Sequence, residues 1–66
     1  MTNQEIVLAA FDKLGGTVHH NKALISAISD MFSISKVAAT ELVELAISDG
    51  VLSMNSIGEL RRGPAA

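Results

Sequence analysis

The sequence predicts an α+β domain in which three helices precede an antiparallel hairpin. Apolar residues recur at helical spacing in three successive stretches, and glycine or serine separates one stretch from the next. After Gly50 the pattern changes to two short apolar runs on either side of Asn55-Ser56, which is typical of two strands and a turn. With 66 residues, 48% hydrophobic and 18% charged, the chain is expected to form one ordered domain over residues 1–66.

The first helix is expected over residues 3–14. Thr2 and Glu5 have the spacing of a capping box, in which each side chain accepts a hydrogen bond from the backbone amide of the other. Gly15-Gly16 ends the helix, because glycine adopts a left-handed C-terminal cap without steric cost.

The second and third helices are expected over residues 22–32 and 36–49. Asn21 and Ser35 precede them and are candidate N-caps, since their side-chain oxygens accept hydrogen bonds from amides of the first turn. Gly50 ends the third helix.

The C-terminal part predicts a hairpin with strands at residues 51–54 and 57–62. A short extended piece at residues 17–19 is placed to become the third strand of the same sheet. Residues 63–66 are expected to fray. The apolar spacing of all these elements predicts a core made of Phe11, Leu14, Ile25, Ile28, Phe32, Leu42, Val43, Ala46 and Leu52.

One apolar pattern extends through the third helix into the hairpin. It consists of Ile34-Ser35, Ala39, Val43, Ala46 and Gly50-Val51-Leu52. Together with the order helix, short strand, helix, helix, hairpin, this pattern resembles the winged helix-turn-helix family of small transcription regulators, over residues 3–62. The resemblance implies that the third helix enters the major groove of duplex DNA and that the hairpin, the wing, contacts the DNA backbone.

On this resemblance the DNA-binding residues belong to the second helix, the third helix and the wing. Hydroxyl groups can bond phosphates or base edges, lysine and arginine neutralise phosphates, and an arginine of the wing can enter the minor groove. The expected set is Lys22, Ser35, Lys36, Val37, Thr40, Glu41, Arg61 and Arg62.

The charge balance favours a second interpretation. Five Lys and Arg residues stand against seven Asp and Glu residues, so the net charge is −2 and counterion release on DNA would be small. In this interpretation the acidic face of the third helix binds and modulates a polymerase or another DNA-binding protein, without binding DNA. Its protein-binding residues are Val37, Glu41, Glu44, Leu45 and Ser48. The small size of the chain is also typical of regulators encoded by phages and mobile elements, which is an analogy of size and fold only.

No pattern of catalytic or metal-binding residues is found. The chain has no cysteine, and His19-His20 would point to opposite faces of a strand, which argues against a zinc site. Neither a nucleophile elbow nor a phosphate-binding loop is present. The chain is therefore expected not to be an enzyme and to bind no metal, cofactor or small-molecule substrate.

The sequence also predicts the cellular location and the oligomeric state of the protein. The longest strictly apolar run, Ile6 to Phe11, is far shorter than the ~20 residues that cross a bilayer, and Met1–Glu5 has no positive signal-peptide region. Together with the absence of cysteine, this predicts a cytoplasmic protein. Apolar surface is expected to be exposed at Leu8, Val37 and Leu45. Because a homodimer could bury this surface, the sequence is compatible with a homodimer as well as with a monomer.

Overall fold

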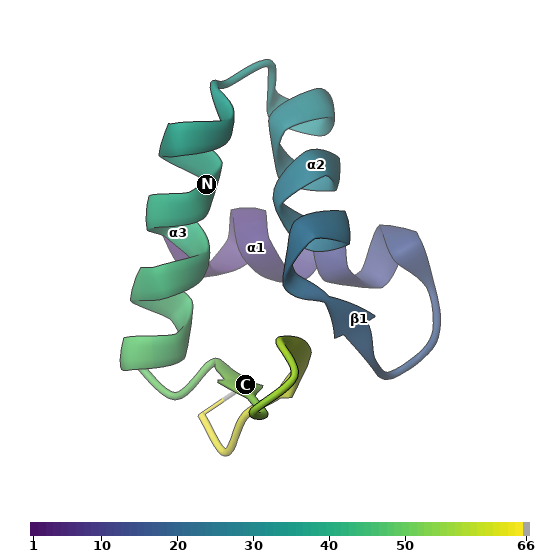
Figure 1. Cartoon of the computed structure of the whole chain (residues 1–66). Helices are drawn as coiled ribbons and strands as arrows, with labels where there is room; N and C mark the ends of the chain where they lie inside the picture. The colour runs from purple at the N-terminus through teal and green to yellow at the C-terminus, as the bar shows by residue number, and fades with distance from the viewer. Residues whose placement is uncertain (66) are drawn as a thin grey trace.

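The computed structural model describes residues 1–65. Within these residues the elements are α1 (Asn3–Leu14), β1 (His19–His20), α2 (Asn21–Phe32), α3 (Lys36–Ser48), β2 (Leu52–Met54) and β3 (Glu59–Arg62). Helices α2 and α3 stand beside each other and are joined by a short loop, while α1 crosses behind them and the strands lie below (Figure 1). The predicted α+β class, with three helices and an antiparallel sheet, is confirmed.

Helix α1 has the predicted bounds because both of its ends are encoded locally. The Thr2 amide donates to Glu5 Oε1 at 3.0 Å, and the Glu5 amide donates to Thr2 Oγ1 at 3.2 Å, which completes the capping box. Gly15 has a φ of +73° at the C-terminal end of the helix. Residues with a Cβ adopt this backbone conformation only with strain, whereas glycine adopts it freely.

Helix α2 begins one residue earlier than expected. His20, rather than Asn21, is its N-cap, because the imidazole Nδ1 accepts a hydrogen bond of 3.2 Å from the Lys22 amide. The prediction that Asn21 caps the helix is therefore wrong, and Asn21 is its first residue. The helix ends at Phe32, and its C-cap Ser33 has a φ of 54° that turns the chain toward α3.

Helix α3 starts at the predicted cap. Ser35 Oγ accepts a hydrogen bond of 3.1 Å from the Ala38 amide. The helix ends at Ser48, one residue before the predicted end, and Asp49 is the C-cap. The chain bends by 119° between α2 and α3. Since Ala39 and Ala46 are both small and buried, α3 can approach its neighbours closely.

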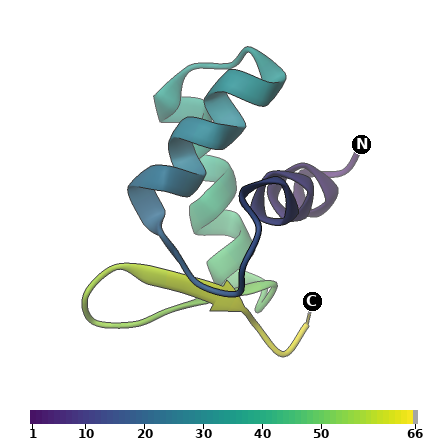
Figure 2. The same cartoon turned by 90° about the vertical axis from the view of Figure 1, so that its right-hand side faces the viewer.

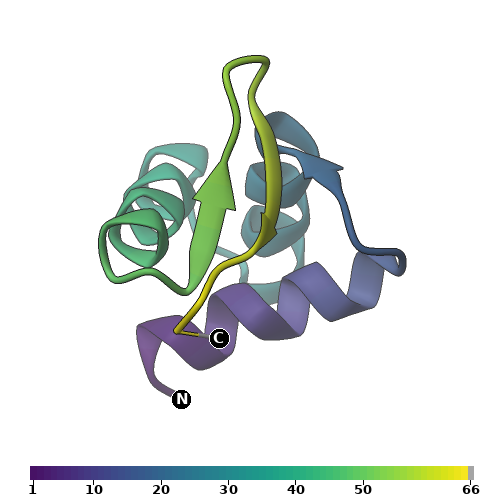
Figure 3. The ribbon, with the colours of Figure 1, turned by 90° about the horizontal axis from the view of Figure 1, so that it is seen from below.

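The three strands form one antiparallel sheet in the order β1–β3–β2. The predicted pairing of the hairpin strands is confirmed, with Leu52 opposite Arg62 and Met54 opposite Leu60. The third strand is also present, but it covers His19–His20 instead of residues 17–19. Seen from below, the hairpin runs between α2 and α3, and its tip points away from α1 (Figure 3).

The hairpin loop is longer than the predicted turn. Asn55 Oδ1 accepts hydrogen bonds from the amides of Ile57, at 3.1 Å, and Glu59, at 2.9 Å. This side chain holds residues 55–58 in a loop, so the second strand begins at residue 59 rather than 57. Ile57, expected inside a strand, lies in the loop and is 68% exposed.

Backbone hydrogen bonds continue past the end of β3. The Gly63 amide donates to the Val51 carbonyl at 2.8 Å, and the Ala65 amide donates to the Gly50 carbonyl at 2.9 Å. A Cβ at Gly63 would lie 2.3 Å from the Gly50 oxygen, so this close approach requires glycine. Residues 63–65 thus lie against the start of the hairpin, whereas Ala66, also expected in the frayed end, lies outside the described residues.

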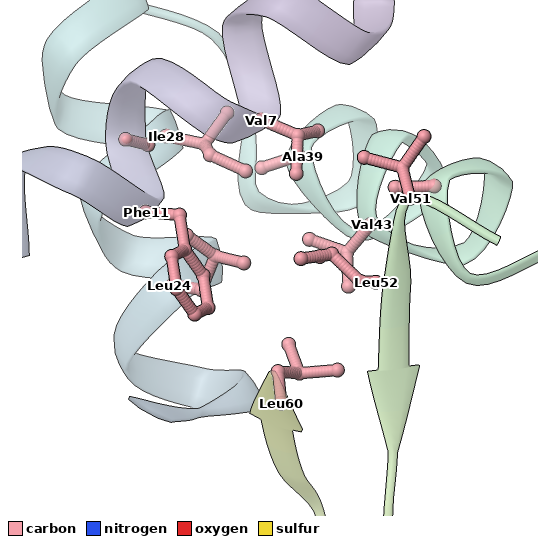
Figure 4. Close-up of a cluster of buried hydrophobic side chains, with 11 residues drawn as sticks. Val7, Phe11, Leu24, Ile28, Ala39, Val43, Val51, Leu52 and Leu60 are labelled. Carbon is pink, nitrogen blue, oxygen red and sulfur yellow. The ribbon is translucent and has the colours of Figure 1, made fainter. Parts of the chain in front are cut away.

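The core lies where all three helices meet the inner face of the sheet (Figure 4). It consists of Val7, Ala10, Phe11, Leu24, Ile28, Ala39, Val43, Ala46, Val51, Leu52 and Leu60. Of the predicted members, Phe11, Ile28, Val43, Ala46 and Leu52 are confirmed. Three others are only half-buried and pack against its margin, namely Ile25, Phe32 and Leu42.

Two leucines of α1 behave differently from the sequence expectation. Leu14, predicted to be buried, is 39% exposed. It belongs to the last turn of α1, which extends beyond α2 (Figure 3). Leu8, expected to be exposed, is half-buried and packs against the core. Helical spacing gave the direction of each side chain, but not how far the neighbouring elements reach along α1.

Candidate functional site

The outer face of α3 carries acidic and apolar side chains together. Its exposed residues are Val37, Glu41, Glu44, Leu45 and Ser48. These positions are three or four residues apart or adjacent, so they share one side of the helix. Val37 is 71% and Leu45 49% exposed, and the two flank the carboxylates. The structure thus brings together all five residues of the protein-binding interpretation.

Two hydroxyl groups expected to contact DNA take part in hydrogen bonds within α3. Ser35 Oγ accepts the Ala38 amide as the N-cap. Thr40 Oγ1 donates to the Lys36 carbonyl at 2.7 Å. The Thr40 hydroxyl proton is therefore engaged, and the group can only accept a further hydrogen bond while this geometry holds. Lys36 itself is exposed at the start of the helix.

The two arginines lie at the base of the hairpin, beside α1. Arg62 forms an ion pair with Asp12 of α1, and its guanidinium carbon lies 5.9 Å from the centre of the Phe11 ring. Arg61 is exposed next to it. Both arginines line a pocket of about 290 Å³ together with Phe11, Gly16 and Thr17.

The hairpin tip projects to the opposite side of the molecule. Viewed along α1, the loop of the hairpin extends away from that helix (Figure 2). Arg61 and Arg62 stand at the other end of β3, so they are separated from the tip. The loop itself, residues 55–58, contains no basic residue. The structure therefore does not place arginines at the tip of the hairpin.

A mainly apolar groove opens between α2, α3 and the hairpin. Its volume is about 310 Å³, and its lining consists of Asn21, Lys22, Ile25, Thr40, Val43, Glu44, Ile47 and Met54. Of the expected site residues, the structure brings Lys22, Thr40 and Glu44 together here. Glu44 belongs to both the groove and the outer face of α3, so the two surfaces are continuous.

Sequence reasoning missed most of this groove. Ile25 was expected in the core, and Met54 inside the strand at residues 51–54. A signal was present in α3, where Thr40, Glu44 and Ile47 are spaced by four and three residues and follow one side of the helix. Its partners on α2 and β2 follow only from the tertiary structure.

The two histidines occupy separate surroundings. The His19 ring meets Phe11 edge-on, with 4.9 Å between ring centres, and its Nε2 is buried without a hydrogen-bond partner within residues 1–65. His20 caps α2 through Nδ1. In the same part of the chain, no group of three or more His, Cys, Asp or Glu residues could hold a metal ion.

Comparison with known protein families, curated proteins and solved structures finds no match to the chain. Within residues 1–65 no single helix is long and apolar enough to cross a membrane. The α2–α3 pair reaches that length and composition only when the two helices are taken together across their 119° bend. A function must therefore be supported by the residues and their geometry.

Proposed function

We propose that the chain is a winged-helix interaction module that binds a basic surface of a partner protein through the outer face of α3. The helix order and the antiparallel hairpin support the winged-helix assignment. The observation that carries the proposed function is the exposure of Glu41 and Glu44 between the exposed Val37 and Leu45. The partner would be a polymerase or a DNA-binding protein whose activity the chain modulates.

The two kinds of side chain on this face have different roles in binding. The carboxylates attract a basic surface and set its orientation, which raises the rate of association more than the final affinity. Val37 and Leu45 lose their water on contact and supply affinity through apolar burial. A helix face with both properties selects a surface that is basic and partly apolar.

DNA binding is a second candidate function, supported by the cations of the two helices. Lys36 is exposed at the N-terminal turn of α3, where a DNA-reading helix meets base edges and phosphates, and Lys22 is exposed at the start of α2. Two observations make it the weaker candidate. Arg62 is paired with Asp12, and Glu41 would repel phosphates from the face of α3.

A charge reversal at Glu41 distinguishes the two candidates. For a basic protein partner, Glu41→Lys replaces attraction by repulsion, and retention of that partner should be lost. For DNA, the same change should strengthen binding to duplexes of mixed sequence. The measurements are fluorescence titration with such duplexes at low and high salt, and retention of proteins from a nuclease-treated lysate on columns of the natural chain and of Glu41→Lys.

Arg61→Ala is the matched control, because Arg61 is also charged and exposed but lies at the base of the hairpin. It should leave the partner's retention unchanged. A salt-sensitive DNA complex that Glu41→Lys strengthens and Arg61→Ala weakens would contradict the proposed protein-binding function and support the second candidate.

A further inference from the structure

We infer that the groove between α2, α3 and the hairpin receives an apolar side chain of the basic partner, while Glu44 and Glu41 hold cationic residues next to it. This inference rests on the proposed function and specifies the partner segment that the site takes. The occupant is a peptide segment with one apolar anchor and adjacent lysine or arginine, all on one side of the segment.

The groove is suited to an apolar side chain. Ile25, Val43 and Ile47 form its walls, and Met54 of the hairpin closes it on one side. The side-chain Nδ2 of Asn21 donates to Met54 Sδ at 3.7 Å, a contact that keeps the methionine beside the groove. Methionine is flexible and adapts its shape to different partners. The volume of about 310 Å³ is near the lower limit for small-molecule pockets, and an anchoring side chain fits within it.

The charged residues around the groove determine the orientation in which the partner's peptide segment binds. Glu44 lies on the α3 side, and Glu41 follows on the outer face of the same helix. Lys22 lies on the α2 side and repels a second cation there. The basic residues of the partner must therefore point toward α3, which makes binding depend on the orientation of the segment as well as on its net charge.

The area needed for a stable complex also favours the groove as part of the interface. A standard interface covers about 800 Å² per partner. That is roughly a fifth of this chain's accessible surface of 3919 Å². The groove adds apolar surface that is continuous with the outer face of α3.

The test begins with selection from a random displayed peptide library on the natural chain, followed by affinity measurements with a synthetic peptide of the selected consensus. Met54→Gln places a polar group of similar length at the groove, and its amide oxygen can still accept from Asn21. It should weaken peptide binding about tenfold, as expected for the loss of an apolar contact worth 1.4 kcal/mol. Glu44→Lys should abolish binding.

Ile57→Gln is the matched control, because it makes the same type of change on the same hairpin but outside the groove. It should leave the affinity unchanged. Shifts of the amide resonances of Ile25, Ile47 and Met54 on peptide addition would place the anchor in the groove. Selected peptides with an apolar anchor and neighbouring basic residues, together with these results, support the inference.

Other outcomes overturn the inference in different ways. If Glu41→Lys abolishes binding while Met54→Gln and Ile57→Gln behave alike, the proposed function stands but the groove is not used. If the selected peptides lack basic residues, or none are selected, the occupant is not the one inferred. If light scattering shows a dimer that Met54→Gln dissociates, a second copy of the chain fills the groove. If neither Glu41→Lys nor Met54→Gln changes binding, both the inference and the proposed function fail.

Discussion

The two faces of α3 differ in side-chain size as well as in polarity. The inner face is formed by Ala39, Val43 and Ala46, which are small and buried. The outer face carries larger side chains, with Val37 and Leu45 exposed beside acidic residues. The inner face is restricted by the close approach of neighbouring helices, where extra volume produces strain. Within residues 1–65 the side chains of the outer face are exposed, so their size is not restricted by close packing.

The largest expected effect on the free energy of unfolding comes from truncating a large core side chain on the inner side of α3. Phe11 of α1 is buried in the core, and Phe11→Ala should cost about 3–5 kcal/mol, which is enough to unfold most of a domain this small. Phe32 lies at the core margin and is only half-buried, so Phe32→Ala should cost less. Urea denaturation followed by circular dichroism measures both. Equal losses in the free energy of unfolding would show that the margin of the core contributes as much to stability as its centre.

A matched pair on α3 tests the comparison directly. Val43 lies on the inner face and Val37 on the outer face of the same helix. Val43→Ala removes two buried carbon atoms and leaves a cavity, with an expected loss of about 2 kcal/mol. Val37→Ala should change the free energy of unfolding by less than about 0.5 kcal/mol. A large destabilisation by Val37→Ala would mean that the outer face is covered, for example by a second copy of the chain.

These positions also show what could be predicted from the sequence. Helix ends and the inner face of α3 follow from local signals, such as the cap at Ser35 and the spacing of Ala39 and Val43. The ion pair of Arg62 with Asp12 joins residues far apart in the sequence, and no local pattern encodes it. For the same reason candidate binding residues could be named from the sequence, but the position of the arginines away from the outer face of α3 could not.

The contrast between inward and outward positions extends to β1. Within residues 1–65 the His19 Nε2 is buried without a hydrogen-bond partner, whereas His20 is exposed and caps α2. His19→Phe keeps an aromatic ring against Phe11 and removes the unpaired atom, so it should raise the free energy of unfolding by about 1 kcal/mol. His20→Phe should lower it by a similar amount through loss of the cap. Thermal unfolding of both variants beside the natural chain checks the opposite signs.

The smallest expected effect concerns a fully exposed group. Hydrogen bonds from the backbone and side chain of Thr2 lower the pKa of Glu5 below its ordinary value. A carboxylate with a lowered pKa stabilises the folded state above the ordinary pKa, and this contribution is lost as the pH falls through the lowered one. Glu5→Gln should therefore make the acid side of the stability–pH curve slightly less steep. An unchanged curve in thermal unfolding from neutral to acidic pH would show that the capping box makes no ionic contribution.

The pairing of β1 with β3 has a consequence for the kinetics of folding. Successive helices form contacts between neighbouring parts of the chain, whereas β1 must meet a strand that lies beyond α2 and α3 in the sequence. Closing so long a loop costs entropy before its contacts stabilise the fold, so we expect the helices to associate first and the sheet to close last. Leu60, paired with His19 and buried, would then be largely unstructured in the transition state. Stopped-flow measurements on Leu60→Ala should show faster unfolding with a nearly unchanged folding rate, so the lifetime of the folded protein would be set by the strand nearest its C-terminus.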